Sequence, residues 1–289
     1  MGVSSVANSA NIQSAIAVAS RRTGIDFNYL LGQAQVESGL RANARAGTSS
    51  ASGLYQFIDQ SWLGVVKAHG GEHGMGWAAD SIKQTSSGRY VVSDPATRRA
   101  ILDLRNDPTA ASLMAAEHAS DNKDALETSL NRPATGTDLY MAHFLGLGGA
   151  RSFLGAMDAN PNRSGASMFP AAARANRNIF YNAGGQPRTL SDIYSRFSDR
   201  LDQGAQSVGA TGSASGAPES FSAAQAQWSS QALEGGGEVV LGTNATDGDR
   251  AWIDTTLANL NTLREPMNPM RPTPQNARLA YLMLARLGA

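Results

Sequence analysis

The sequence predicts an all-α domain followed by a flexible tail that bears short helices. Through residues 1–201, apolar residues recur at helical spacing, in segments bounded by residues that commonly cap helices. Almost no segment alternates apolar and polar residues as a strand does. After Leu201 the composition shifts to Gly, Ala, Ser and Gln, which is typical of a linker.

Length and composition exclude several classes of protein. The chain has 289 residues, of which 42% are hydrophobic, enough for one large domain with an appendage. It has no Cys, which excludes disulfides, thiolate catalysis and Cys-based metal sites. The formal net charge is zero, and the small excess of Lys and Arg before Leu201 is too weak to indicate nucleic acid. No apolar run approaches the roughly 18 residues of a membrane span, and the N-terminus does not read as a signal peptide.

The first two helices are predicted from their ends. Gly24 can end the first helix, and Asp26 is a favourable N-cap for the second. Glu37 follows Leu30 by seven residues and Ala34 by three, which places it on the apolar stripe of the second helix. We therefore expect the Glu37 side chain to face the protein rather than bulk water.

Further elements follow in order along the chain. A loop is predicted over 41–52, then a helix that opens at Asp59 or Ser61, and an irregular stretch over 74–93 with room for a hairpin. Other helices are predicted near 95–106, 108–130, 137–145 (capped by Thr137) and 150–159, from Pro170, and after the capping-box pattern at 189–192.

The domain organisation follows from these elements and the composition shift. We expect an all-α domain over 1–201, a low-complexity linker over 202–248 and a short helical segment over 249–289. The last segment contains predicted helices near 250–263 and 276–288, separated by a proline-rich spacer.

Two short motifs resemble the signature of the lysozyme-like lytic transglycosylases. In that family Glu-Ser ends a helix, a loop follows, and then comes Gly-Leu-Met-Gln-Ile. Here Glu37-Ser38 is followed by Gly-Leu-Tyr-Gln-Phe over 53–57. The spacing between the two halves also fits the family.

Two later motifs extend the resemblance, which covers roughly residues 10–200. Asp107-Pro108 is similar to the Asp-Pro that opens a long helix in the family. The sequence AHFLGLGGA over 142–150 is similar to the family's Ala-Tyr-Asn-Ala-Gly and glycine turn, with His143 in place of the tyrosine.

The resemblance implies a lysozyme-like fold and an activity on peptidoglycan. Such enzymes cleave the MurNAc-β-1,4-GlcNAc bond, leave 1,6-anhydro-MurNAc ends and need no cofactor or metal. The implied partner is the glycan strand, and the implied location is the periplasm or cell wall of a bacterial or phage system. A protein partner for the C-terminal tail is also expected.

Glu37 is the predicted catalytic acid, and later the base. Cleavage of a glycosidic bond needs a proton on the leaving oxygen as an oxocarbenium-like transition state forms. Burial disfavours a charged carboxylate, so the position of Glu37 on the apolar stripe predicts a raised pKa.

The other predicted site residues would line the cleft around Glu37. The resemblance implies that Gln56 holds the sugar near the scissile bond. Tyr55 replaces the family methionine and would offer a flat surface to the sugar, and His143 could hydrogen-bond the carboxyl group. The predicted substrate-binding set is Ser38, Gly53, Tyr55, Gln56 and His143.

Further candidates are weaker. Tyr181 lies in a literal Tyr-Asn-Ala-Gly, but no glycine-rich turn and apolar helix follow it. Glu117 is predicted to face inward, as a second cleft carboxylate or as a buried partner for an Arg such as Arg98. A hydroxyl group supporting the acid would come from Thr48, Ser49 or Ser50.

His69-Gly-Gly-Glu72-His73 fits the letters of an inverted zinc-protease motif. That chemistry needs both histidines on one face of a helix. Gly70 and Gly71 disfavour a helix, so no zinc site is predicted there.

Two other functions remain as alternatives. The first is a hydrolytic muramidase of the same fold, which would need a second carboxylate. Asp59 is better explained as a helix cap, and Glu117 is a weak candidate, so the anhydro product is favoured. The second is a non-catalytic wall-binding or assembly module of a flagellar, secretion or phage-tail apparatus, against which the intact Glu37 and Gln56 argue.

Overall fold

The computed structural model describes residues 3–47 and 49–216. The chain divides into two units, Met1–Glu238 and Val239–Ala289, and the described residues all lie in the first. The predicted helices near 250–263 and 276–288, most of the predicted linker and the candidate hydroxyl of Thr48 lie outside the described residues.

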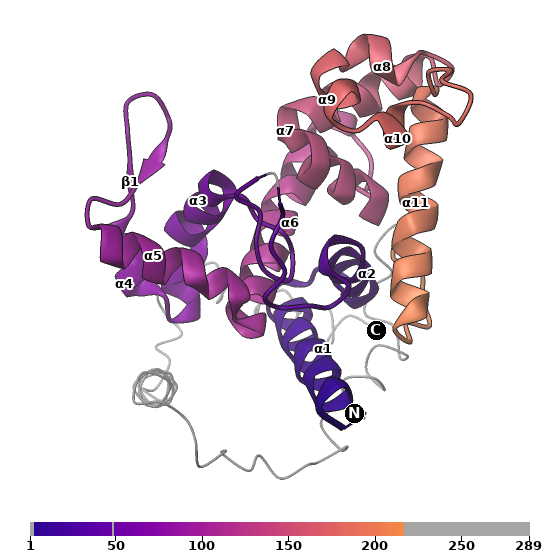
Figure 1. Ribbon diagram of the computed structural model, residues 1–289. Helices are drawn as coiled ribbons and strands as arrows, with labels where there is room; N and C mark the ends of the chain where they lie inside the picture. The colour runs from indigo at the N-terminus through magenta and orange to yellow at the C-terminus, as the bar shows by residue number, and fades with distance from the viewer. Residues whose placement is uncertain (1–2, 48, 217–289) are drawn as a thin grey trace, which may run out of the picture. The chain divides into compact units, whose positions relative to one another are not determined.

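The described part of the chain is mostly helical, as predicted (Figure 1). In the described residues, β1 (Lys83–Gln84) and β2 (Tyr90–Val91) pair as an antiparallel hairpin, inside the stretch 74–93 that was predicted to be irregular with room for a hairpin. The helices are α1 (Val3–Thr23), α2 (Phe27–Ser38), α3 (Asp59–His69), α4 (Gly76–Ser81), α5 (Pro95–Asp103), α6 (Pro108–Leu130), α7 (Gly136–Ala159), α8 (Gly165–Met168), α9 (Pro170–Ala175), α10 (Arg177–Phe180) and α11 (Leu190–Ser207), with 3-10 turns η1 (Gly70–His73) and η2 (Leu104–Asn106).

Side-chain caps explain why most of these helices begin where they do. Asp26 accepts a hydrogen bond from the backbone N–H of Tyr29, and Asp107 accepts one from Ala110 ahead of Pro108. The capping box predicted at 189–192 is present at the start of α11. Helix α7 is capped by Thr135 in a second capping box, and not by Thr137 as predicted.

Helix α7 consists of two helical pieces joined at Gly146. This glycine has φ 72° and ψ 160°, which an L side chain rarely adopts and which breaks the helix. The two pieces correspond to the separate helices predicted near 137–145 and 150–159. The first piece carries the side chains that reach Glu37.

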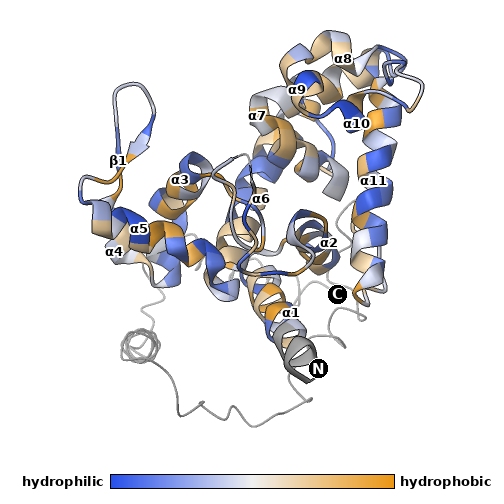
Figure 2. Ribbon diagram, in the orientation of Figure 1, coloured by the Kyte–Doolittle hydropathy of each residue, from blue (hydrophilic) through white to orange (hydrophobic). Residues whose placement is uncertain are grey.

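The core lies where the long helices meet. Helix α1 packs against α6, α6 against α7, and α2 against α11, as Figure 1 also shows. Figure 2 shows hydrophobic and hydrophilic residues alternating around α11, whose buried residues recur every three or four positions: Leu190, Ile193, Phe197, Leu201 and Ala205.

The folded unit extends past the boundary predicted after Leu201. Helix α11 continues to Ser207, and the chain then turns back so that Ala214 is buried. The backbone N–H of Gly136 donates to the carbonyl of Gly216 at 2.8 Å. The Gly, Ala and Ser residues that suggested a linker instead pack closely against the start of α7, because their side chains are small. A Cβ on Gly136, for example, would lie 1.9 Å from the carbonyl oxygen of Ala214.

Among the helices that the structure describes, none combines the length and the apolarity needed to cross a bilayer. This agrees with the absence of a membrane span predicted from the sequence.

Candidate active site

Glu37 lies in the last turn of α2, where the helix is ended by Gly39. Gly39 adopts the left-handed conformation (φ 62°), and its N–H bonds back to the helix carbonyls, so the chain turns sharply just after Glu37. The Glu37 side chain is only 19% exposed. The prediction that it faces the protein is therefore confirmed.

Two side chains from the first piece of α7 hold one oxygen of the Glu37 carboxylate. The hydroxyl of Tyr140 donates a hydrogen bond to Oε1 at 2.7 Å. Nε2 of His143 lies 3.5 Å from the same oxygen. Tyr140 and His143 are three residues apart and so lie on one face of α7.

The pKa of Glu37 is lowered, contrary to the prediction. Burial by itself raises it, as predicted. The hydrogen bond and positive charge of His143, the hydrogen bond from Tyr140 and the charge of Arg200 together lower it by more. Sequence reasoning foresaw the burial but not these neighbours, which favour the ionised carboxylate.

Aromatic packing fixes His143 in place. Its ring stacks on Tyr140 with centroids 5.9 Å apart, and Phe57 meets it edge to face at 6.2 Å. Phe57 in turn packs edge to face against Trp62. This ring cluster joins α7 to the loop that precedes α3.

Ser38 does not face a ligand, contrary to the prediction. Its side chain is buried, its hydroxyl donates to the carbonyl of Ala34, and its oxygen accepts the backbone N–H of Arg41. Ser38 therefore shapes the turn after α2. It supports Glu37 through the backbone and not by contact with sugar.

Tyr55 also departs from the prediction. Its side chain is fully buried, so it cannot offer a flat surface to a sugar. Leu54 and Phe57 of the same motif are buried as well, so most of the motif faces the core. The aromatic ring of Tyr55 therefore packs in the core and not at the surface.

Gly53 and Gln56 hold the loop in a tight conformation. Gly53 has φ 82°, and a Cβ on it would lie 1.9 Å from the carbonyl oxygen of Arg105, so only glycine fits. Gln56 has φ 49°, a strained conformation that is common at functional sites. Nε2 of Gln56 donates to the carbonyls of Ala44 and Gly53, and the side chain remains partly exposed.

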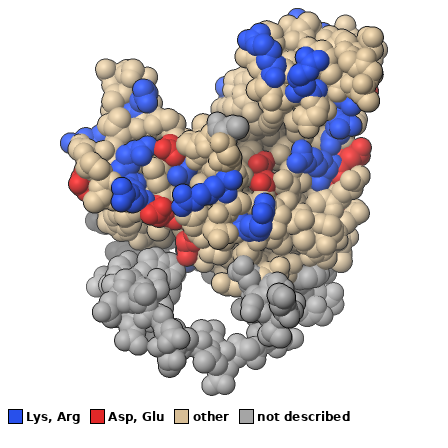
Figure 3. All heavy atoms as spheres, viewed as in Figure 1, with Lys and Arg blue, Asp and Glu red and all other residues tan. Residues whose placement is uncertain are grey.

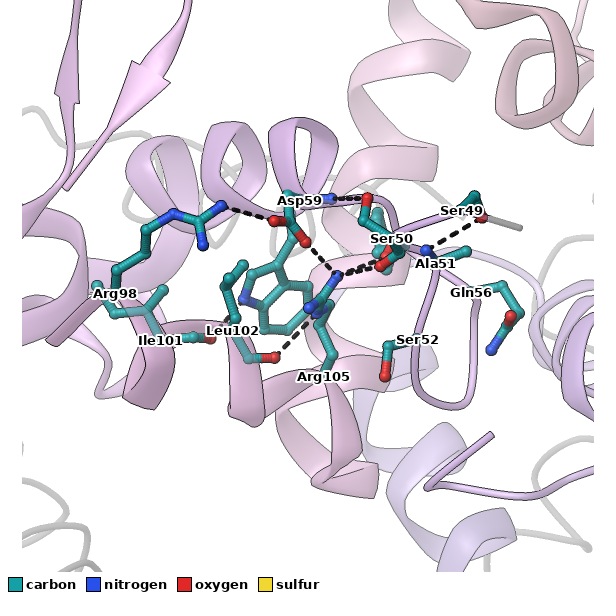
Figure 4. Close-up of polar contacts among 12 residues, drawn as sticks. Ser49, Ser50, Ala51, Ser52, Gln56, Asp59, Arg98, Ile101, Leu102 and Arg105 are labelled. Carbon is teal, nitrogen blue, oxygen red and sulfur yellow. Dashed lines mark hydrogen bonds and ion pairs between the residues drawn. The ribbon is translucent and has the colours of Figure 1, made fainter. Parts of the chain in front are cut away.

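Arg105 anchors this loop from beneath, and sequence reasoning missed it. The buried Arg105 side chain donates from Nη1 to the carbonyls of Ser50 and Phe57 and to Oδ1 of Asp59 (Figure 4). Oδ2 of Asp59 accepts from Arg98 at 2.6 Å. Asp59 thus binds two arginines and makes no side-chain cap, which corrects the prediction for it.

A polar pocket lies beside the anchored loop. Figure 4 shows Gln56 on the other side of the loop from the Asp59–Arg105 pair. The predicted loop hydroxyls Ser49 and Ser50 border the pocket rather than Glu37. Its lining residues are Arg45, Ala46, Ser49, Ser50, Ala51, Ser52, Asp59, Leu102, Asp103, Arg105 and Asn106.

The two weaker candidates lie in other surroundings. Glu117 contacts His73 at 2.7 Å and His69 at 3.6 Å, whereas Arg98, the partner suggested for it from the sequence, is paired with Asp59. Tyr181 follows α10 and lines a separate pocket with Arg177, whose guanidinium lies 4.8 Å from its ring centroid. Neither residue is brought to the Glu37 carboxylate by a contact in the described part of the chain.

The surface of the described part of the chain is hollowed. On the face in Figure 3, a hollow separates the part containing α3, α4 and α5 from the part containing α7 to α11, and Lys and Arg side chains lie on both sides of it. Helix α2, which carries Glu37, packs against both α6 and α11. Asp and Glu side chains also lie on both sides, so the borders of the hollow on this face carry mixed charge.

Sequence reasoning also missed Tyr140 and Arg200. The signal for Tyr140 was its position three residues before His143, which puts both on one helical face. No protein-family model matches the chain. Its function is therefore inferred from the carboxylate, its α7 partners and the anchored loop.

Proposed function

We propose that this chain is a lysozyme-like lytic transglycosylase that cleaves the MurNAc-β-1,4-GlcNAc bond of peptidoglycan. One observation carries the proposal. A partly buried glutamate, Glu37, lies in the last turn of a helix, and one of its two oxygens is held by Tyr140 and His143. The His143 ring in turn packs on Phe57 of the tightly held Gly53–Phe57 loop. A carboxyl group held in this way can give and take a proton at its other oxygen.

The contacts assign separate roles to the two carboxylate oxygens. Because Tyr140 donates to Oε1, that oxygen is the fixed one. The transferable proton therefore resides on Oε2. Tyr140 and His143 act as positioning residues that keep Oε2 directed at the bond to be cleaved.

Because its pKa is lowered, Glu37 ionises more readily in the free protein than an ordinary glutamate does. A glycan strand that excludes water from the site increases burial, which raises the pKa of the carboxyl group. We therefore expect an acidic optimum for the capture of substrate by the free protein.

The anhydro product follows from the absence of an available second carboxylate among the candidates. Asp59 is bound by Arg98 and Arg105, and Glu117 by His69 and His73. A retaining glycosidase with a protein nucleophile would need a second carboxyl group about 5–5.5 Å from the first. The N-acetyl group of MurNAc is left to meet the positive charge at C1.

The chemical steps then balance without water. Glu37 gives its proton to the glycosidic oxygen as the C1–O bond breaks, and the N-acetyl oxygen bonds to C1. The ionised Glu37 takes the proton of the C6 hydroxyl, O6 bonds to C1, and the bond from the N-acetyl oxygen breaks. The product is a 1,6-anhydro-MurNAc end, and Glu37 is again protonated.

The fold and location are part of the same proposal. The mostly helical fold is compatible with a lysozyme-like domain, which is part of the proposal, and the proposed substrate would require the periplasm or the cell wall. The C-terminal tail would then bind a protein partner.

A zymogram on purified cell walls tests whether the chain is an enzyme. The unaltered chain should clear the walls, and Glu37→Gln should not, because the amide keeps the shape and loses the proton. Asp124→Asn, an exposed carboxylate on α6, is the matched control and should clear walls normally. Clearing by Glu37→Gln would mean that Glu37 is not the acid, and no clearing by any chain would favour the non-catalytic wall-binding alternative.

A further inference from the structure

A second cluster of ionisable side chains lies where α3 and η1 meet α6, apart from Glu37. It contains His69, Glu72 and Glu117, and one potential donor atom from each lies within 4.8 Å of the other two. Helix α3 ends at His69, and η1 continues the helical turn to His73. The cluster therefore connects the end of α3 and the turn η1 to the long helix α6.

The hydrogen bonds identify which atom of His69 faces the cluster. Nε2 of His69 lies 2.9 Å from a carboxylate oxygen of Asp121, which can only accept. Nε2 must therefore carry the proton, so in the neutral imidazole Nδ1 carries a lone pair. That lone pair faces Oε2 of Glu117 at 3.6 Å.

Glu117 is oriented by its other oxygen. Nε2 of His73 donates to Oε1 of Glu117 at 2.7 Å, and Nδ1 of His73 lies 3.5 Å from a guanidinium nitrogen of Arg22. A guanidinium only donates, so this contact keeps the proton of His73 on Nε2. Oε2 of Glu117 is thereby directed at His69.

A nitrogen lone pair and a carboxylate oxygen that face one another repel, so a positive charge must lie between them, either a proton on Nδ1 or a bound cation. In a tetrahedral zinc site with bonds of about 2.1 Å, two ligand atoms lie about 3.4 Å apart. The 3.6 Å between Nδ1 of His69 and Oε2 of Glu117 is close to that value. A carboxylate oxygen of Glu72, which is exposed, lies within 4.8 Å of a donor atom of each of the other two residues.

We propose that His69, Glu72 and Glu117 form a zinc site. An imidazole with two carboxylates favours Zn²⁺ over Mg²⁺ or Ca²⁺, which prefer oxygen ligands alone. Asp121 and His73 are the outer partners, since each bonds to a ligand and fixes its orientation, as such partners do at zinc sites.

The α-helix ends at His69, as the two glycines predicted, and the chain continues as the 3-10 turn η1. Gly70 has φ −57° and ψ −34°, within the helical region, and Gly71 lies in the 3-10 turn. His69 and His73 therefore both reach Glu117 despite the two glycines. The bound ion would tie η1 to α6, one residue from His118, whose ring packs on Phe57.

The test uses the full chain, first stripped of metal with a chelator. Zinc is titrated in by calorimetry while the melting temperature is recorded. We expect one equivalent to bind, and a rise in Tm of about 5 °C or more when free zinc exceeds Kd by about 100-fold. Mg²⁺ at the same concentration should give no comparable rise.

Variants locate the site. Glu72→Gln changes an exposed side chain and should weaken zinc binding by at least about ten-fold, as should Glu117→Gln, while Asp124→Asn on α6 should bind as the unaltered chain does. If Glu117→Gln fails to fold, Glu72→Gln decides alone.

Three results would overturn the proposal. The first is the absence of saturable 1:1 binding. The second is unchanged affinity in Glu72→Gln. The third is loss of zinc in Glu37→Gln but not in Glu72→Gln, which would move the ion to the Glu37–His143 pair.

Discussion

The hydroxyl of Tyr140 donates to Oε1 of Glu37 at 2.7 Å, although the two residues are 103 positions apart in the sequence. This bond joins the end of α2 to the first piece of α7. It occupies one oxygen of the carboxylate and favours its ionised form. The orientation and the acidity of Glu37 are therefore both set by a residue on another helix.

Replacing Tyr140 should change both properties. Tyr140→Phe removes a hydrogen bond to a charged group, worth about 1.5–3 kcal/mol, so activity on cell walls should fall by about ten-fold or more. It also removes one of the influences that lower the pKa of Glu37. The alkaline limb of the pH profile of kcat/KM should therefore move to higher pH, which kinetics on soluble glycan fragments would measure.

Tyr194→Phe is the matched control for this prediction. Tyr194 also donates its hydroxyl to a carboxylate, that of Asp138, but not to Glu37. Its variant should keep the pH profile of the unaltered chain. An identical profile in both variants would show that Tyr140 does not govern the acidity of Glu37.

The lowered pKa of Glu37 predicts how stability depends on pH. A carboxyl group whose pKa is lower in the folded state stabilises that state above its ordinary pKa of 4.5, and this contribution is lost as the pH falls through the folded value. Chemical denaturation at several pH values should show the unaltered chain more stable than Glu37→Gln at pH 7, with the gap narrowing below pH 4.5. A gap that widens on acidification would mean that burial dominates the pKa.

The sequence predicted the parts of the fold that local chemistry determines. The caps at Asp26 and Asp107 were found because a side chain bonds to a backbone three residues away, which is visible in the sequence. The inward direction of Glu37 was found from helical periodicity. Both rest on neighbours within one helix.

The parts that were missed depend on contacts between distant segments. The stripe showed that Glu37 is buried, but not that Tyr140 and His143 bring charge and hydrogen bonds to it. The position of Tyr55 in its motif did not reveal which way the loop turns its side chain. The small residues after Leu201 suggested a linker. Their close packing against α7 is a contact between distant segments, which the local sequence does not show.

The conformation of Gly53 makes a strong prediction about stability. Gly53→Ala places a Cβ 1.9 Å from the carbonyl oxygen of Arg105 at a φ of 82°, so the loop or η2 must move. We expect a loss of about 3 kcal/mol or more in the free energy of unfolding, measured by chemical denaturation. Gly47→Ala, in the same loop, meets nothing within 4 Å and should change little. Equal effects of the two variants would contradict the described loop.

The segment 213–216 should depend on Asp202. Oδ1 of Asp202 accepts the backbone N–H groups of Ala214 and Ser215, and Oδ2 accepts the hydroxyl of Ser215 at 2.6 Å. Asp202→Asn should cost about 1–3 kcal/mol and speed proteolysis and amide exchange in this segment. A chain ending at residue 205 should be less stable than one ending at Gly216. Equal stability of the two would restore the boundary after Leu201.

The central claim is that Glu37 alone moves the proton in both steps and that no water enters the product. The direct measurement is mass spectrometry of purified cell walls digested in ¹⁸O water by the unaltered chain and by Glu37→Gln. The account predicts 1,6-anhydro-MurNAc ends, one water lighter than hydrolytic products and free of ¹⁸O, and a rate near background for Glu37→Gln with an unchanged circular dichroism spectrum. Reducing MurNAc ends that carry ¹⁸O, or undiminished cleavage by Glu37→Gln, would contradict it.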